Sequence, residues 1–132
     1  MNSKLLINTA LFGVVFGALN SFGIISENYE WIFWFGFLIF CAFMLKRKLK
    51  KDFLIQGIVM GFVFSVLVYV TQSLLIENYC IVHPDYVKQV RELSSTISIS
   101  GYMMFSGLII SAIYAVAAGA FSLGLVKFSK RN

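Results

Sequence analysis

The chain has 132 residues, with a hydrophobic fraction of 59%, a charged fraction of 13% and a formal net charge of +5. Soluble domains are roughly 25% charged, so the composition excludes an ordinary soluble domain. The length indicates a single domain over residues 1–132. The basic excess does not indicate nucleic-acid binding, because five of the 11 cations lie in one short segment that is too thin to form such a surface.

Four apolar stretches predict an all-α integral membrane protein, because backbone in lipid must satisfy its own hydrogen bonds. A spanning helix needs roughly 20 apolar residues. We expect a four-helix bundle whose spans cover, in chain order, residues 5–25, 29–46, 53–76 and 99–127.

The first two spans are less regular than the others. Lys4 precedes the first as in a signal peptide, but Phe16 and Leu19 interrupt the small residues that a cleavage site needs. The first span is therefore interpreted as an uncleaved signal anchor. The second is short, and reaches spanning length only if residues 28–29 and the stems of Lys46 and Arg47 contribute.

A basic segment separates the second span from the third. Its simplest role is to fix the topology of the chain. It is also suited to contact anionic lipid, at about 1 kcal/mol per cation, or an acidic cytoplasmic partner. Its cations are Lys46, Arg47, Lys48, Lys50 and Lys51.

The cations are distributed unequally between the two ends of the predicted bundle. Lys88 and Arg91 lie in the loop after the third span. The other nine are at the chain ends and in the basic segment: Lys4, Lys46, Arg47, Lys48, Lys50, Lys51, Lys127, Lys130 and Arg131. The positive-inside rule then places both termini and the basic segment in the cytoplasm, which requires the short second span to cross.

The loop from residue 77 to residue 100 predicts a short amphipathic helix between the third and fourth spans. Pro84 suits the first turn of a helix, and Asp85 suits its positive end. Val87 and Val90 then recur at helical spacing. Such a helix is expected to lie at the outer membrane interface.

Small residues recur every fourth position in three of the spans. Lipid gives helices no hydrophobic reason to associate, so close backbone approach at small residues drives their packing. We expect these residues to form seams within the bundle, with a homo-oligomer face as the alternative. They are Gly13, Gly17, Gly57, Gly61, Ser111, Ala115 and Gly119.

The centres of the spans contain no charged residue. Ion-coupled transporters and proton relays need such a group, and small multidrug antiporters need an acid in the first helix, so both classes are disfavoured. The uncharged polar residues are interpreted as partners in interhelical hydrogen bonds. The alternative is a polar cleft lined by Asn20, Tyr69 and Gln72.

Nothing in the sequence indicates an enzyme, a cofactor or a metal. No nucleophile and base occur at a recognisable spacing, and no Cys/His pattern resembles a zinc site. His83, in the outer loop, is expected to be solvated. Cys41 and Cys80 are expected at different depths, too far apart for a disulfide.

The third span and the loop after it resemble a bacterial membrane family. The residues that carry the resemblance are Asp52, Phe53, Gly57, Gly61, Tyr69, Pro84, Asp85 and Tyr86, within about residues 31–127. The family is called domain of unknown function 4199. The resemblance implies a bacterial inner-membrane protein with four spans, and it assigns no activity.

Two functions stay open at this point. The first is a structural or accessory protein of the inner (cytoplasmic) membrane that binds another membrane protein or itself. The second is a passive channel or transporter for a neutral or hydrophobic solute. A filled core with an exposed glycine favours the first, and an open polar cleft reaching the middle of the membrane favours the second.

Overall fold

The computed structural model describes residues 3–131, which form six α-helices and no strand. In chain order these helices are α1 (Ser3–Ser21), α2 (Glu27–Lys48), α3 (Phe53–Leu74), α4 (Ile76–Val82), α5 (Pro84–Leu93) and α6 (Ile99–Arg131).

Four of the helices, α1, α2, α3 and α6, are long and apolar enough to cross a membrane. This confirms the predicted all-α class with four candidate spans. α2 and α6 extend beyond their predicted bounds, and two other helices end earlier than predicted. α1 ends at Ser21 because Gly23, at φ +74°, turns the chain where the apolar stretch continues. α3 ends at Leu74, and the separate short helix α4 replaces its expected last residues and the start of the loop.

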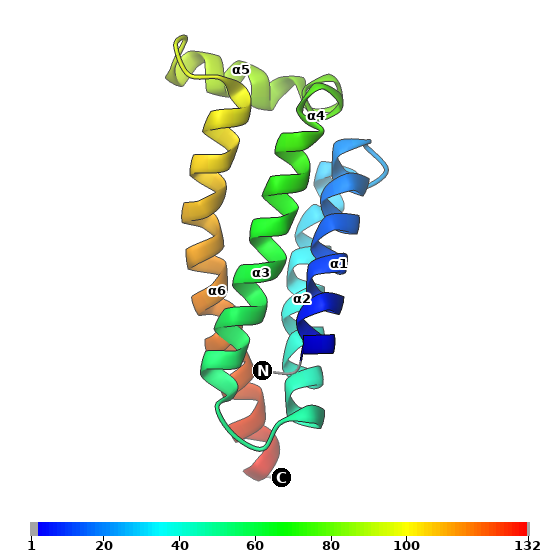
Figure 1. Ribbon diagram of the computed structural model, residues 1–132, viewed down its shortest axis with the longest axis vertical. Helices are drawn as coiled ribbons and strands as arrows, with labels where there is room; N and C mark the ends of the chain where they lie inside the picture. The colour runs from blue at the N-terminus through cyan, green and yellow to red at the C-terminus, as the bar shows by residue number, and fades with distance from the viewer. Residues whose placement is uncertain (1–2, 132) are drawn as a thin grey trace.

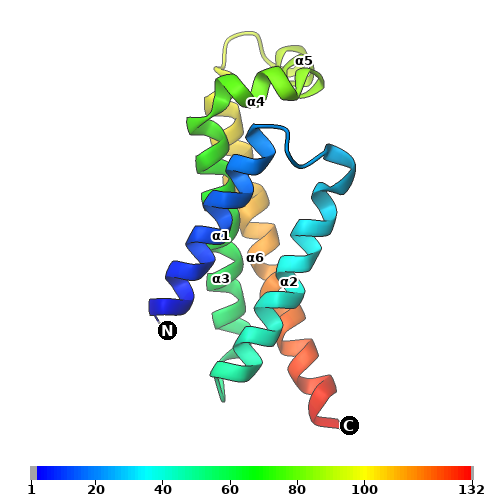
Figure 2. The ribbon, with the colours of Figure 1, turned by 90° about the vertical axis from the view of Figure 1, so that its right-hand side faces the viewer.

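The long helices stand side by side, with α3 packed between α6 and α1. α2 packs mainly against α6 and less extensively against α3 (Figure 1). Both chain ends and the α2–α3 turn lie at one end of the bundle. The α1–α2 loop, α4 and α5 lie at the other end, where α4 and α5 run across the bundle (Figure 2). This shared end for the termini is what an even number of spans requires.

The small residues of α3 and α6 face each other closely. A Cβ atom on Gly57 would lie 2.8 Å from the Cα of Gly119, and one on Gly61 would lie 2.6 Å from the Cβ of Ala118. The backbone of Ala115 also approaches Gly61. Because no side chain fits between them, the two helices pack at backbone contact distance.

α1 approaches α3 in the same way. A Cβ atom on Gly13 would lie 2.6 Å from the carbonyl oxygen of Phe64, and one on Gly17 would lie 2.7 Å from that of Val68. Ser111 of α6 is also fully buried. The structure therefore places the predicted seam residues inside the bundle, between helices of one chain.

Aromatic rings fill the middle of the bundle. The rings of Phe37 and Phe64 stack with centroids 3.8 Å apart, and Trp34 meets Phe16, Phe64 and Tyr114 edge-on. We call these five residues the aromatic cluster. It joins α1, α2, α3 and α6 at one level, and such edge-on pairs are favourable beyond their burial.

Four buried hydroxyl groups bond within their own helices. Thr9, Ser21, Ser65 and Ser122 each donate to the carbonyl oxygen four residues earlier in their own helix, at 2.8–2.9 Å. The prediction of interhelical bonds is wrong for Thr9, Ser21 and Ser65. A Ser or Thr hydroxyl in a helix can donate its hydrogen bond to a carbonyl oxygen of the same helix, so it needs no partner on a neighbouring helix.

α6 is longer than its neighbours. It has 33 residues, against 19 in α1. At about 1.5 Å per residue α6 is about 50 Å long, which exceeds the roughly 30 Å of a bilayer's hydrocarbon core.

Candidate functional site

A groove lies between α1 and α2, with a volume of about 300 Å³. Six phenylalanines and one isoleucine line it, together with a glycine. The lining residues are Phe12, Phe16, Ile32, Phe33, Gly36, Phe37, Phe40 and Phe64. We call this the α1–α2 groove.

Large rings hold the two walls of the groove apart. Phe12 of α1 meets Phe40 of α2 with ring centroids 5.3 Å apart, and Phe16 meets Phe33 at 5.7 Å. The backbones of α1 and α2 make few direct contacts, and the N-terminal part of α2 leans away from α1 (Figure 2). The groove follows from this separation.

Gly36 differs from the glycines of the helix seams. A Cβ atom there would meet nothing within 4 Å, whereas one on Gly13 or Gly57 would overlap a neighbouring helix. Gly36 is exposed on α2 and lines the groove. The spacing of small residues in the sequence did not single out Gly36. Ile32 and Phe40 occupy the positions four residues away, where a second small residue would have indicated a seam.

The residues of the predicted polar cleft are mostly enclosed. Asn20 is 0% exposed and Gln72 is 2% exposed, whereas Tyr69 is half-buried. Tyr69 packs its ring against Gly107 of α6 and lies 6.1 Å from the ring of Trp34. The amide group of Asn20 has no hydrogen-bond partner among the described residues. These side chains are therefore packed within the bundle.

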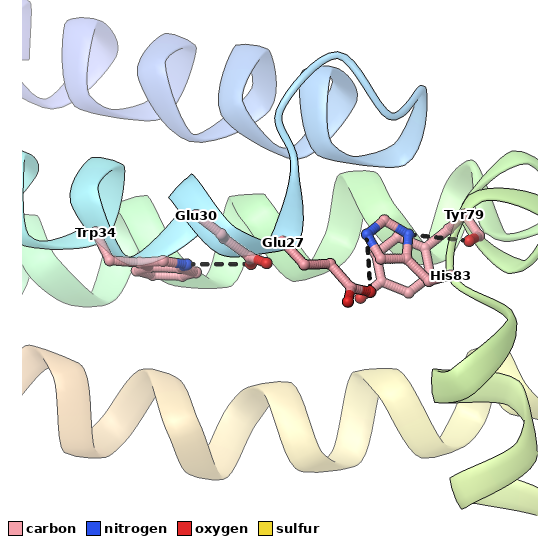
Figure 3. A network of polar contacts seen from close by, with 5 residues as sticks. All are labelled: Glu27, Glu30, Trp34, Tyr79 and His83. Carbon is pink, nitrogen blue, oxygen red and sulfur yellow. Dashed lines mark hydrogen bonds and ion pairs between the residues drawn. The ribbon is translucent and has the colours of Figure 1, made fainter.

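A polar network at the α4 end was not expected. His83 is only 3% exposed, so the expectation of a solvated histidine is wrong. Its Nδ1 lies 3.1 Å from the carbonyl oxygen of Tyr79, and its ring stacks on the Tyr79 ring at 4.1 Å. Its Nε2 lies 3.7 Å from Glu27, while Trp34 donates to Glu30 (Figure 3). The network joins the start of α2 to the end of α4.

Burial affects the titration of groups around this network. Burial raises the pKa of the Tyr79 hydroxyl, and the nearby Glu30 carboxylate raises it further. Burial also raises the pKa of Tyr86, against a lowering effect of Ser106. Burial raises the pKa of the Cys80 thiol, which Arg91 partly offsets. These shifts keep the groups protonated and do not activate a nucleophile.

The basic segment lies at the opposite end, with its cations exposed. Lys46 donates to Ser129 of α6. Cys41 and Cys80 are free, and no group of three potential metal ligands was found among His, Cys, Asp and Glu residues 3–131.

Four long apolar helices around an aromatic cluster define a multi-pass helical membrane protein. No family model, no curated protein and no solved structure matches the chain. The resemblance to the bacterial family of unknown function therefore stays a prediction.

Proposed function

We propose that this protein is a non-enzymatic accessory subunit of a bacterial inner (cytoplasmic) membrane. In this proposal it binds one helix of another membrane protein over the α1–α2 groove. The observation that carries the proposal is Gly36, a glycine in the middle of a candidate span where an added Cβ atom would meet nothing within 4 Å. Membrane helices approach one another closely at small residues. The surface beside Gly36 is open to such an approach.

The size of the groove determines what can enter it. A helix about 10 Å wide that rises 1.5 Å per residue occupies roughly 120 Å³ per residue. A groove of about 300 Å³ cannot hold a whole helix, but it can receive side chains from one lying across its mouth. The partner helix would place large apolar side chains beside Gly36.

The concave shape favours a different protein over a second copy of this one. A two-fold dimer pairs the same surface on both subunits. Two grooves facing each other would leave both unfilled, whereas a convex helix surface fills one. We therefore infer that the partner is a different protein.

The aromatic cluster favours an accessory role over the second candidate, a passive channel for a neutral or hydrophobic solute. A channel needs a continuous route between the helices. Phe16, Phe37 and Phe64 are each less than 10% exposed at the level where such a route would cross the bundle. Asn20 and Gln72 are enclosed, so they line no open polar cleft in this conformation.

The orientation in the membrane belongs to the same proposal. The end with both termini carries most of the lysines and arginines of the chain, and we infer that it faces the cytoplasm. The network around His83 and helix α5 would then lie at the outer face.

Site-specific photocrosslinking in native membranes tests the proposal. A photoreactive benzoyl-phenylalanine replaces Phe33 in the groove, and the control replaces Ile113, which is 67% exposed on α6. We expect one protein adduct of defined mass from position 33 and none from position 113. Adding Gly36→Leu to the position-33 chain should abolish the adduct, because the new side chain fills the groove.

Other outcomes would contradict the proposal. An adduct of twice the chain mass would show that a second copy covers the groove. Lipid adducts alone, from both positions, would show that the groove is filled by bilayer lipid. Protein adducts that survive Gly36→Leu would place the contact elsewhere.

A further inference from the structure

A second cavity lies at the end of the bundle that carries the termini. It has a volume of about 350 Å³ and shares no residue with the α1–α2 groove. Its lining comes from the end of α2, the α2–α3 turn, the start of α3 and the last turns of α6. The lining residues are Lys46, Leu49, Lys50, Phe53, Val126 and Lys130.

Three lysines from two distant parts of the chain meet at this cavity. Lys46 and Lys50 come from the basic segment, and Lys130 comes from α6. The bond from Lys46 to Ser129 ties the end of α2 to α6 beside the cavity. No acidic side chain lines it, so the charge around it is positive.

The inner wall of the same cavity is apolar. Phe53 and Val126 are 9% and 4% exposed, and Leu49 is half-buried beside them. A cavity with cations at its rim and apolar side chains at its base fits a ligand that is anionic at one end and apolar at the other. It lies where α2 ends and α3 begins, which is the depth of lipid headgroups if these helices span the membrane.

We propose that this cavity binds the phosphate headgroup of an anionic membrane phospholipid. The three lysines hold the phosphate, and Leu49, Phe53 and Val126 contact the first part of the acyl chains. Basic pockets between spanning helices are suited to such headgroups. The proposal differs from general attraction by the basic segment, because it requires Lys130 of α6 and does not require Arg47, Lys48 or Lys51. It does not depend on the accessory role proposed above.

Native mass spectrometry of the full chain in non-ionic detergent tests this inference. The probes are phosphatidylglycerol and phosphatidylcholine with the same acyl chains, and inorganic phosphate serves as a competitor. We expect one phosphatidylglycerol molecule to be retained in preference to phosphatidylcholine. The variant Lys46→Gln/Lys50→Gln/Lys130→Gln should bind phosphatidylglycerol about 100-fold more weakly, since each lysine near an anionic headgroup contributes about five-fold.

The matched control removes the same charge from the same end of the molecule. Arg47→Gln/Lys48→Gln/Lys51→Gln changes three exposed cations that do not line the cavity, and should weaken binding less than about five-fold. If loss of the Lys46–Ser129 bond disturbs the fold, Lys50→Gln/Lys130→Gln keeps that bond and should still weaken binding about 25-fold.

Three results would overturn the inference. Equal losses in the two triple variants would mean diffuse attraction to the whole basic end. Equal retention of phosphatidylcholine would mean that the phosphate charge is not recognised. Displacement of phosphatidylglycerol by equimolar inorganic phosphate would identify free phosphate as the ligand.

Discussion

Tyr114 links two helices, whereas Ser21, Ser65 and Ser122 donate hydrogen bonds within their own helices. The Tyr114 hydroxyl donates to the backbone carbonyl of Trp34 at 2.6 Å, from α6 to α2. Ser65 donates instead to Gly61 in its own helix. The Tyr114 hydroxyl therefore joins two helices, and the Ser65 hydroxyl does not.

We expect Tyr114→Phe to lower the free energy of unfolding by about 0.6 kcal/mol and by at most about 1.7 kcal/mol. Ser65→Ala, the matched control, should change it by much less, because its bond can be lost without separating two helices. Equilibrium unfolding in mixed micelles measures both. A larger loss for Ser65→Ala would contradict the roles assigned to these two hydroxyls.

Two glycines provide a second comparison at single residues. In Gly57→Ala the added methyl group would overlap the backbone of Gly119 and Ala118, at 2.8 Å and 2.9 Å. We expect a loss of about 1–3 kcal/mol in unfolding free energy from this overpacking. Gly36→Ala meets nothing and should be neutral or slightly stabilising, because alanine favours a helix. Equal destabilisation in micelles would show that Gly36 is already packed within the chain.

Helix α5 is held against the rest of the molecule by one side of its surface. Val90 is 1% exposed, whereas Leu93, at the end of the same helix, is 70% exposed. Pro84 begins the helix and Asp85 lies in its first turn, where its charge suits the positive end of the helix.

A charge at position 90 should release this helix. We expect Val90→Asp to lower amide-exchange protection across residues 84–93, because a buried unpaired carboxylate is strongly disfavoured. Leu93→Asp places the same charge on the exposed surface and should leave the protection unchanged. Hydrogen exchange with mass spectrometry measures both, and equal protection in the two variants would mean that Val90 does not hold α5 in place.

The sequence was sufficient for the long helices but not for their ends. Apolar stretches of spanning length predict α1, α2, α3 and α6, because the membrane restricts the backbone to helices. The break at Leu75 separates α3 from α4 without a proline or glycine, so no residue in the sequence marks it. Gly23 did carry a turn signal, but it was hidden within an apolar stretch.

The candidate sites could be predicted only in part, because they depend on which helices become neighbours. The basic segment was visible as a run of charge, but the approach of Lys130 to Lys46 and Lys50 was not. The same holds for His83, whose burial depends on Tyr79 and on Glu27 at the start of α2.

At the scale of the whole molecule, the proposed topology makes opposite predictions for the two ends. In a Cys80→Ser background, where the remaining Cys41 is buried, we introduce either Ser95→Cys or Lys51→Cys. Both positions are exposed. In spheroplasts, an impermeant maleimide should label position 95, and it should label position 51 only after the membrane is permeabilised. The reverse pattern would invert the orientation.

The unequal lengths of α1 and α6 have a consequence for the surrounding bilayer. α1 matches the hydrocarbon thickness of about 30 Å, whereas α6 exceeds it and must tilt or extend into the headgroup layer. Hydrophobic mismatch costs fractions of a kcal/mol per Å and is relieved by tilting or by local deformation of the lipid. If tilting relieves only part of this mismatch, the lipid beside α1 would be thinner than the lipid beside α6. A neighbour with short spans would be drawn to the α1 side.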